Sequence, residues 1–271
     1  INASFMALIK AISEVDSVIL GGGTHFHDDY SFKRYLRHVL YMLRYTFLFL
    51  YARLKKKRVY CLGVGIGPLK YSLTTLITKA THSLTTMTTV REEVSYKVVQ
   101  EKILPTNRIS QVFDLAGILY HSQQNQTPLR MGKKESKQGR VLGVSVLSIS
   151  NQAQFISSNK IFQEQIANAL VELLNTNPDL SIHIFVFRGE WPRENDIESS
   201  KSLYARLQLI AQDRVKIIQY TDNVWDVMEN IAKCDLFLAT RFHSMILAYL
   251  SKCPIIYIAY HEKNKALAQM I

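Results

Sequence analysis

Short apolar runs alternate with amphipathic segments along the first part of the chain. The runs at residues 17–20, 59–62 and 87–90 predict buried strands, and the longer segments at 5–15, 39–54, 72–81 and 92–101 predict helices. Two glycine-rich segments, residues 21–23 and 63–67, follow the first two strands and predict turns. Alternation of this kind is typical of a parallel sheet that carries helices on its faces.

A second alternating series begins after a change of composition. Residues 122–140 are polar and basic with few apolar positions, which is typical of a linker. Beyond them the pattern predicts strands at 141–149, 181–187, 215–219, 236–239 and 255–258, and helices at 161–174, 199–211, 224–233 and 245–252. We therefore predict two Rossmann-like α/β domains with parallel sheets, residues 1–130 and 131–271, and a ligand site in the cleft between them.

Composition and charge limit the possible partners. The 271-residue chain is 48% hydrophobic and 20% charged, as in ordinary globular proteins, and its net charge is +11. A basic surface attracts nucleic acid, anionic lipid or anionic small molecules. We expect no nucleic-acid partner, because the sequence has no aromatic-basic RNA signature and no helix-turn-helix pattern. Cys61, Cys234 and Cys253 lie in or beside apolar runs without metal-binding spacing, which predicts buried thiols in a reduced, cytosolic protein.

Basic residues form two clusters along the chain. The run at residues 55–58 directly follows the apolar segment 39–54, so this stretch could make peripheral contact with a membrane surface. The alternative, which we favour, is a partly buried crossover helix that leads into the next strand. Lys133, Lys134 and Lys137 form the second cluster, and both clusters are typical of solvated linkers or helix ends.

Arg241 and His243 stand where one apolar run ends and the next begins. In open α/β sheets a strand-to-helix junction of this kind is where ligands bind. The helix N-terminus favours an anion, because it offers backbone N–H donors and partial positive charge. Arg91 and Lys263 follow two other predicted strands in the same way. Together these strand ends predict a strongly cationic site.

Structural explanations compete with functional ones at these and other motifs. The less favoured alternative for Arg241 is an ion pair with a carboxylate such as Asp235 or Asp222, with His243 as a capping group. Residues 25–29, His-Phe-His-Asp-Asp, resemble a metal cluster, but loop His and Asp residues are more often solvated or hydrogen-bonded, so we predict no metal. The glycine turns lack the spacing of dinucleotide-binding and phosphate-binding loops, so NAD and ATP are not supported.

Five motifs, taken in order, resemble the polysaccharide pyruvyl transferase family. They are Gly21-Gly22-Gly23 with Asp28 after it, the Gly-rich segment from Gly63 to Leu69 with Gly65 and Gly67, Arg91-Glu92-Glu93-Val94-Ser95, Arg241-Phe242-His243, and Tyr260-His261-Glu262-Lys263. Glu92 and His261 each stand where the family has Asp. The resemblance implies the two-domain fold called GT-B. We expect the N-terminal domain to bind the acceptor and to lack the family's first strand. We expect the C-terminal domain to bind the donor.

The resemblance also implies a reaction. Family members transfer pyruvate from phosphoenolpyruvate to a sugar of a cell-surface polysaccharide, or of its lipid-linked precursor, and form a cyclic ketal. The scheme requires no cofactor and no metal. Phosphoenolpyruvate carries a carboxylate and a phosphate close together, and Arg binds either group as a bidentate fork.

The residues that match the motifs take roles by the same resemblance. Arg241 and Arg91 hold the two anionic groups, His243 acts as acid/base or phosphate ligand, and Lys263 stabilises the leaving phosphate or donates the proton. The expected substrate-binding positions are Gly21, Gly22, Gly23, Asp28, Gly65, Gly67 and Ser95.

Two alternatives remain open. One is a GT-B glycosyltransferase that uses a nucleotide sugar, which requires an acidic or aromatic nucleoside pocket in the C-terminal domain, and Glu190, Trp191 and Glu262 are candidates for it. The other is a non-catalytic member of a polysaccharide assembly complex. For an enzyme of exopolysaccharide synthesis we expect a cytoplasmic location, at the inner face of the plasma membrane where the acceptor is lipid-linked.

Overall fold

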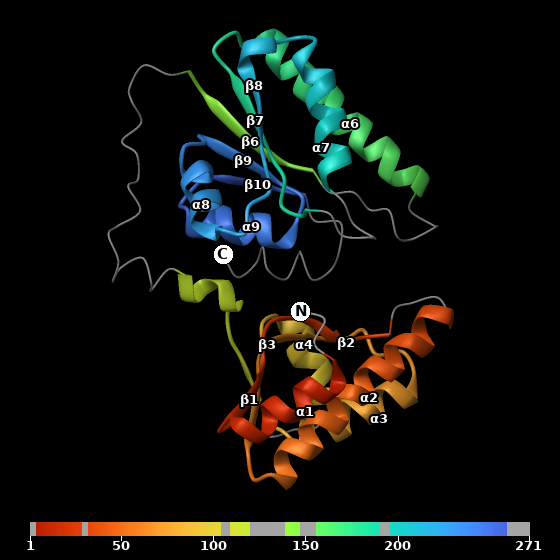
Figure 1. Ribbon diagram of the computed structural model, residues 1–271. Helices are drawn as coiled ribbons and strands as arrows, with labels where there is room; N and C mark the ends of the chain where they lie inside the picture. The colour runs from red at the N-terminus through yellow and green to blue at the C-terminus, as the bar shows by residue number, and fades with distance from the viewer. Residues whose placement is uncertain are drawn as a thin grey trace. The chain divides into compact units, whose positions relative to one another are not determined.

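The computed structural model describes residues 4–28, 32–103, 109–119, 139–146, 156–189 and 196–258. The chain forms two compact units, of which unit 1 ends at Leu115 and unit 2 begins at Ala116 (Figure 1). Residues 120–138, which include most of the predicted linker, lie outside the described part. Each unit is built around its own parallel sheet, as the alternating pattern predicts.

Unit 1 follows the predicted order of elements and adds two short strands. Its elements are α1 (Phe5–Glu14), β1 (Ser17–Leu20), β2 (Gly23–Phe26), α2 (Phe32–Leu54), β3 (Arg58–Ile66), α3 (Ser72–Ser83), β4 (Met87–Val90), α4 (Glu93–Val98), a π-helical turn (Val99–Ile103) and β5 (Ile109–Gln111). The described strands pair in the order β1-β3-β4-β5, and β2 pairs with the far end of β3, all in parallel. The sequence pattern misses β2, which begins in the glycine-rich segment and has no apolar run, and β5, which has only three residues.

The predicted turn at residues 63–67 is wrong, because β3 continues through Gly63 and Gly65 to Ile66. Glycine usually weakens a strand, but it also lets other groups approach the backbone closely. A Cβ atom on Gly65 would lie 2.8 Å from Thr24 Oγ1, and one on Gly63 would lie 2.8 Å from Leu115 Cγ. A close neighbour therefore requires glycine at Gly65, and both a close neighbour and a positive φ of +60° require it at Gly63.

The hydrophobic core of unit 1 confirms that residues 39–54 belong to a partly buried crossover helix. The helix α2 connects β2 to β3 and buries Val39, Met42 and Phe49 against the sheet residues of unit 1. It is thus a crossover helix with one side in the core. Within the described residues, no helix combines the length and the apolar character that crossing a bilayer requires.

Unit 2 contains every strand and helix predicted for the second half. Its elements are β6 (Val141–Ser145), α6 (Ile156–Thr176), β7 (Ser181–Phe185), α7 (Asp196–Gln208), β8 (Val215–Ile218), α8 (Val224–Ala232), β9 (Leu236–Ala239), α9 (Phe242–Leu250) and β10 (Ile255–Tyr257). The described strands form one parallel sheet in the order β10-β9-β6-β7-β8. Figure 1 shows α6 and α7 on one face of this sheet, and α8 and α9 on the other.

The strand order creates a switch point between β6 and β9. The chain builds β7 and β8 outward on one side of β6 and then returns to place β9 and β10 on the other side. In open parallel sheets, ligands bind outside the carboxyl ends of the strands at such a point. Arg241 follows β9 after one intervening residue, so the fold places the motif Arg241-Phe242-His243 at this switch point.

The strands β6 and β9 pack closely beside the switch point. A Cβ atom on Gly143, in the middle of β6, would lie 2.5 Å from the Phe237 ring and 2.9 Å from Cys234 Sγ. The absence of a side chain at Gly143 therefore lets the neighbouring strand β9 pack closely. Cys61, Cys234 and Cys253 are all buried free thiols, as predicted.

The buried imidazole of His82 makes the stability of unit 1 depend on pH. The centroids of the His82 and Phe26 rings are 4.8 Å apart, and His82 Nδ1 lies 3.0 Å from Thr88 Oγ1. Burial lowers the pKa of His82 from 6.5 to about 4. Between these two pH values the unfolded chain binds a proton that the native His82 does not. We expect the free energy of unfolding to fall by about 3 kcal/mol as the pH drops through this window. Urea unfolding followed by circular dichroism from pH 7 to pH 4 measures this slope, and His82→Gln should flatten it. An unchanged slope in the variant would assign the pH dependence to other groups.

Candidate active site

Three buried hydroxyl groups fix the junction between β9 and α9. Arg241 has extended backbone dihedral angles (φ −106°, ψ 148°) and α9 begins at Phe242, as predicted. The Ser145 hydroxyl accepts a hydrogen bond from Thr240 N at 3.1 Å and donates to Ser244 Oγ at 2.9 Å. Ser244 Oγ in turn accepts from Arg241 N at 3.2 Å. The carboxyl end of β6 is therefore tied to the helix N-terminus, and Arg241 and its helix are held in one orientation.

Arg241 forms a nearly buried ion pair with Asp196, the first residue of α7. The Nη2–Oδ1 distance is 2.5 Å, and the two side chains are 15% and 1% exposed. The sequence alternative of an ion pair between Arg241 and a carboxylate is therefore confirmed, with Asp196 as the partner; of the carboxylates named for it, Asp235 accepts a hydrogen bond from Val141 N and Asp222 accepts one from Tyr220. Asp196 follows a segment without apolar periodicity, so the sequence pattern gave no reason to choose it.

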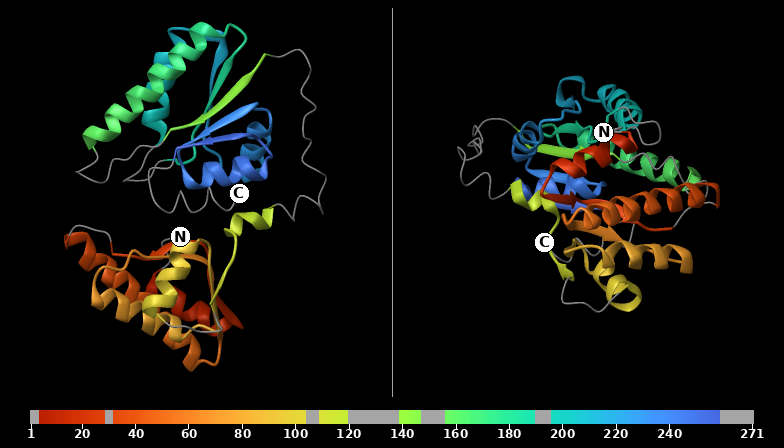
Figure 2. Two further views of the ribbon diagram at one scale, coloured as in Figure 1. Left: turned by 180° about the vertical axis from the view of Figure 1, so that it is seen from behind. Right: turned by 60° about the horizontal axis from the view of Figure 1, so that its bottom comes forward.

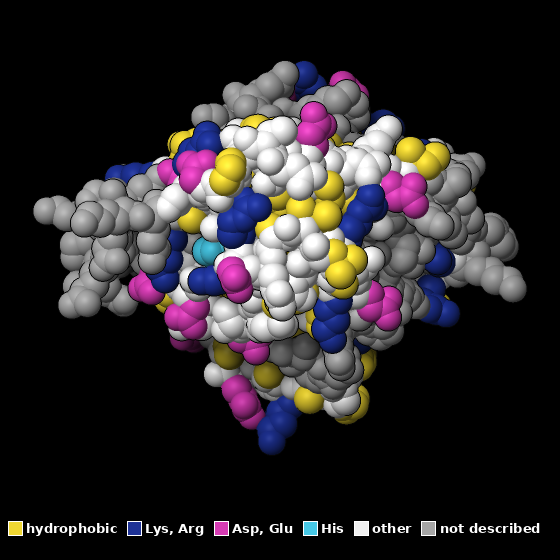
Figure 3. Space-filling model, turned by 90° about the horizontal axis from the view of Figure 1, so that it is seen from above, with side chains coloured by type: hydrophobic (Ala, Val, Ile, Leu, Met, Phe, Trp, Pro, Cys, Tyr) yellow, Lys and Arg dark blue, Asp and Glu magenta, His cyan; other side chains and the backbone are white. Residues whose placement is uncertain are grey.

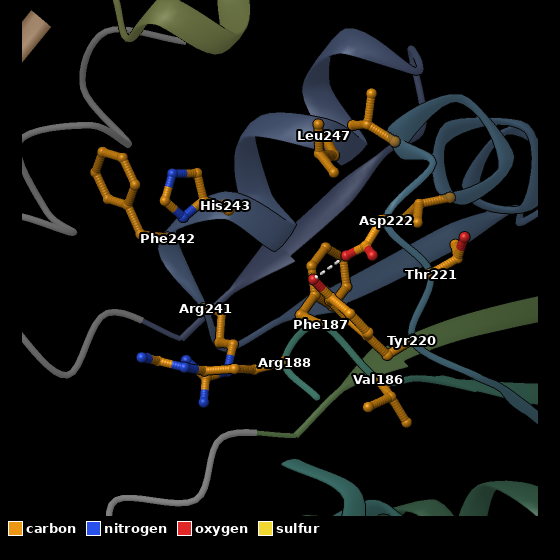
Figure 4. Close-up of a pocket in the computed structure, with 12 residues that line it drawn as sticks. Val186, Phe187, Arg188, Tyr220, Thr221, Asp222, Arg241, Phe242, His243 and Leu247 are labelled. Atoms are coloured by element: carbon orange, nitrogen blue, oxygen red, sulfur yellow. Dashed lines mark hydrogen bonds between the residues drawn. The ribbon is translucent and has the colours of Figure 1, made fainter. Parts of the chain in front are cut away.

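A pocket of about 530 Å³ opens beside Arg241, at the carboxyl ends of β7, β8 and β9. It is lined by Val186, Phe187, Arg188, Tyr220, Thr221, Asp222, Val224, Val227, Arg241, Phe242, His243 and Leu247. Figure 4 shows the side chains of Arg188 and Arg241 at the same end of the pocket in this view. Two arginines, of which Arg241 is paired with Asp196, and a helix N-terminus line one pocket, and this arrangement is suited to an anion. Arg188 was not among the predicted site residues.

The other end of the pocket is aromatic and acidic. The Tyr220 hydroxyl donates a hydrogen bond of 2.8 Å to Asp222 Oδ1, which is the dashed line in Figure 4. That bond raises the pKa of Tyr220, so the phenol stays neutral at physiological pH. A neutral hydroxyl and a carboxylate at this distance from each other are suited to hydrogen bonds with the hydroxyl groups of a sugar.

His243 presents an exposed imidazole at the second position of α9. Phe242 lies beside it, with an edge-to-face arrangement and 5.5 Å between the ring centroids. Ser244 is fully buried and points into the hydroxyl cluster. Two neighbouring residues of α9 thus have different roles. His243 faces the pocket and solvent, while Ser244 stabilises the turn between β9 and α9.

Arg91 lies in unit 1, in a buried network of charged groups. Its Nε is 3.0 Å from Glu92 Oε2, its Nη1 is 2.9 Å from Asp114 Oδ2, and the Arg91 side chain is only 8% exposed. Its Nη2 donates a longer bond of 3.4 Å to Thr24 Oγ1. Two carboxylates outweigh the single positive charge, so this geometry favours a structural role over binding of an anion.

Ser95 joins the same network to the end of β3. Its hydroxyl accepts a hydrogen bond of 2.8 Å from Ile66 N and lies 2.8 Å from Glu92 Oε1. A Cβ atom on Gly65 would lie 3.0 Å from that same Glu92 oxygen. The motif Arg-Glu-x-x-Ser thus holds β3, β4 and α4 together, with Gly65 leaving the room that Glu92 needs.

The glycine triplet and the acidic residue after it are also explained by local structure. Asp28 is 1% exposed, and its carboxylate accepts hydrogen bonds of 2.8 Å from Lys70 N and Tyr71 N, so it caps the N-terminus of α3. The glycines of these segments are explained by backbone conformation and by close neighbours. Gly23 has a φ of +98°, which favours glycine. His25 Nε2 lies 2.7 Å from the carbonyl oxygen of Gly22. Gly21 and Gly22 are close to the Leu115 side chain, while Gly67 has a φ of +90° and packs near Val98.

The histidines of residues 25–29, for which we predict no metal, make other contacts. The His27 ring packs on the His38 ring with 4.7 Å between centroids, and Asp28 is occupied at α3. Across the part of the chain that the structure describes, no group of three His, Cys, Asp or Glu side chains is placed to hold a metal ion. Asp29 lies outside the described residues, as do Lys263 and its motif, the cluster at Lys133, and Glu190, Trp191 and Glu262.

The family of the chain follows from its whole length. The model of the family described as polysaccharide pyruvyl transferase matches residues 2–262. The chain belongs to this family. No curated protein is significantly similar to it.

Solved structures show how this family member is folded. A protein from Listeria monocytogenes assigned as a UDP-N-acetylglucosamine 2-epimerase aligns with a TM-score of 0.60 and 10% identity, over 99% of this chain and 66% of that protein. The UDP-GlcNAc 2-epimerase of Methanocaldococcus jannaschii aligns with a TM-score of 0.60 and 16% identity, over 97% and 68% of the two chains. The MnaA protein of S. aureus, solved with UDP, aligns with a TM-score of 0.53 and 13% identity, over 95% and 62%. These likenesses establish the α/β fold with two Rossmann-like domains, known as GT-B, and the chain spans about two thirds of the length of these proteins.

Proposed function

We propose that the protein transfers the pyruvyl group of phosphoenolpyruvate to two hydroxyl groups of a sugar, in a cell-surface polysaccharide or its lipid-linked precursor, and forms a cyclic ketal. One observation carries the proposal: Arg188, Arg241 and the N-terminus of α9 line one pocket in a member of the pyruvyl transferase family. The donor has a carboxylate and a phosphate, and each is a group that Arg binds as a bidentate fork. The pocket volume lies in the usual range for small-molecule sites and leaves room for a sugar beside the donor.

The proposed reaction assigns a role to each group of the pocket. Arg188 and Arg241 hold the phosphate and the carboxylate, and α9 adds its N-terminal partial charge. His243 gives a proton to the methylene carbon of phosphoenolpyruvate, so that positive charge develops at C2. One sugar hydroxyl attacks C2 and gives its proton back to His243, phosphate leaves from C2, and the second hydroxyl closes the ketal and gives its proton to the released phosphate. Lys263 stays a candidate for stabilising the leaving phosphate.

The acceptor is assigned to the aromatic and acidic end of the pocket. Tyr220 and Asp222 offer hydrogen bonds to sugar hydroxyls, and Phe187 offers an apolar face on the same pocket wall. For Arg91, Asp28, Gly65 and Ser95 we propose a positioning role within unit 1, because their contacts are made with the protein itself.

Acceptor-dependent phosphate release tests this proposal. The full chain is incubated with phosphoenolpyruvate and a nitrophenyl sugar or a lipid-linked sugar, and phosphate and the ketal product are measured. We expect both products in equal amounts, and binding of phosphoenolpyruvate by calorimetry that weakens at least about tenfold in Arg188→Ala. An absence of phosphoenolpyruvate binding would contradict the proposal. Tight binding with no turnover on any acceptor would favour a non-catalytic member of an assembly complex.

A nucleotide-sugar glycosyltransferase is the second candidate, because the pocket has the aromatic and acidic residues that a nucleoside site needs. Phe187, Tyr220 and Asp222 are the residues concerned. Calorimetry with UDP separates the two functions. Binding of UDP that is tighter than binding of phosphoenolpyruvate, together with transfer from a UDP-sugar, would support the glycosyltransferase.

A further inference from the structure

One side of α2 exposes a straight row of large apolar side chains that the cores do not use. The row consists of Leu36, Leu40, Leu43, Phe47, Leu50 and Leu54, and each of these side chains is between 44% and 72% exposed. Spacings of four and three residues alternate along the row, so all of its members lie on one side of the helix. Val39, Met42 and Phe49 occupy the side that faces the core. The helix therefore has two apolar faces, and only one of them is buried by the fold.

Neighbouring helices extend this apolar row. Both α1 and α3 contact α2, as Figures 1 and 2 show. The Phe5 ring of α1 packs 5.4 Å from the Phe47 ring. Met6 on α1 is 71% exposed, and Leu73 and Leu76 on α3 are 50% and 63% exposed. Large exposed apolar side chains on three helices that contact one another are typical of an interaction site.

The same three helices carry almost only positive charge. The sequence of α2 contains no Asp or Glu, and in α1, α2 and α3 together the single acid is Glu14. The bases of the three helices are Lys10, Lys33, Arg34, Arg37, Arg44, Arg53 and Lys79. The exposed run at residues 55–58 follows directly after Leu54. This surface is therefore apolar along its centre and basic along its edges.

Unit 2 shows that such a charge distribution is not general in this chain. Figure 3 views the side of unit 2 formed by β8, α6 and α7, where basic and acidic side chains are interspersed. The helix α7, for example, combines Asp196 and Glu198 with Lys201 and Arg206. Segregation of charge at α2 is a local property of unit 1.

Charge decides which partner fits the row. Alternating spacings of four and three also suit a second helix, but the residues that flank such a seam must then pair with opposite charges. A second copy of this chain would bring Arg37, Arg44 and Arg53 against the same bases, which is repulsive. A bilayer with anionic headgroups satisfies both features, because leucine side chains enter the acyl boundary and bases contact the headgroups.

We propose that the apolar row of α2 and its flanking bases bind the surface of a bilayer that contains anionic phospholipid. The helix lies in the plane of the interface, with Leu40, Phe47 and Leu50 below the headgroups and Arg37 and Arg53 among them. This binding is independent of the chemistry proposed for unit 2, and it is measured without substrate.

Flotation of the full chain with lipid vesicles tests the proposal. We expect binding to phosphatidylcholine vesicles that contain phosphatidylglycerol, weaker binding at high salt, and at least about tenfold weaker binding to phosphatidylcholine alone. The variant Leu40→Glu/Leu50→Glu should lose about tenfold or more of its affinity, since two inserted side chains become charged. Arg37→Gln/Arg53→Gln should lose a similar factor on anionic vesicles only.

A matched control and two contrary outcomes complete the experiment. Leu209→Glu changes an 87% exposed leucine of unit 2 and should bind vesicles like the unaltered protein. Circular dichroism checks that every variant is folded. Equal binding to neutral and anionic vesicles, or unaltered binding by the row variant, overturns the proposal. A dimer in sedimentation analysis that the row variant abolishes, without vesicle binding, assigns the row to self-association instead.

Discussion

Replacing Arg241 with alanine is expected to lower kcat/KM for pyruvyl transfer by about a thousandfold or more. The guanidinium lines the pocket, forms an ion pair with Asp196, and has a positive charge that alanine cannot supply, while Ser244 accepts a hydrogen bond from the Arg241 backbone N–H. Its removal also leaves the Asp196 carboxylate, which is 1% exposed, without its charged partner. We therefore expect a second effect, a loss of about 3 kcal/mol in the free energy of unfolding of unit 2.

The double variant Arg241→Ala/Asp196→Asn separates these two effects. Neutralising Asp196 removes the uncompensated charge, so stability should recover while activity stays lost. Both tryptophans, Trp191 and Trp225, lie in unit 2, so tryptophan fluorescence during urea unfolding reports on this unit. Arg241→Lys keeps the charge but not the fork and should retain part of the activity. Full activity of Arg241→Ala, or activity that returns with stability in the double variant, would contradict the assigned role.

The order of elements could be predicted because parallel sheets have a strong sequence signal. Strands buried on both faces are continuous apolar runs, and crossover helices are amphipathic, so the pattern indicates both. The pattern misses β2, which begins in the glycine-rich segment and has no apolar run, and β5, which has only three residues. The sequence predicts a turn at residues 63–67 because it does not distinguish glycine in a turn from glycine inside a strand, where a close neighbour requires it at Gly65 and a positive φ also requires it at Gly63.

The candidate site could be predicted only as far as strand ends identify it. The strand-end pattern includes Arg241 and His243 and applies equally to Arg188, which directly follows the predicted strand at 181–187 but was not among the predicted residues, whereas Asp196 follows a segment without periodicity. Arg91 follows a strand in the same way as Arg241, yet two carboxylates surround it. A strand end indicates at which edge of the sheet a charged side chain lies. It does not indicate which groups neutralise that charge, because these come from elsewhere in the chain, as Asp114 does for Arg91.

Replacing Arg91 with methionine is expected to lower the free energy of unfolding of unit 1 by about 3 to 5 kcal/mol. Methionine keeps much of the side-chain volume but leaves Glu92 and Asp114, which are 1% and 6% exposed, as like charges without a cation between them. Circular dichroism should show earlier unfolding, while tryptophan fluorescence, which reports on unit 2, should not change.

Arg140→Met is the matched control for this prediction, because Arg140 forms an ion pair with Asp179 in which the two side chains are 59% and 55% exposed. Exposed pairs contribute little, so this variant should lose less than about 1 kcal/mol. A substrate-binding role for Arg91 would instead give a raised KM for phosphoenolpyruvate at normal stability. Since the guanidinium is 8% exposed and faces two carboxylates, a large loss of stability is the outcome that its surroundings require. Replacing Glu92 with glutamine as well should then recover part of the loss, because one of the two uncompensated charges is removed.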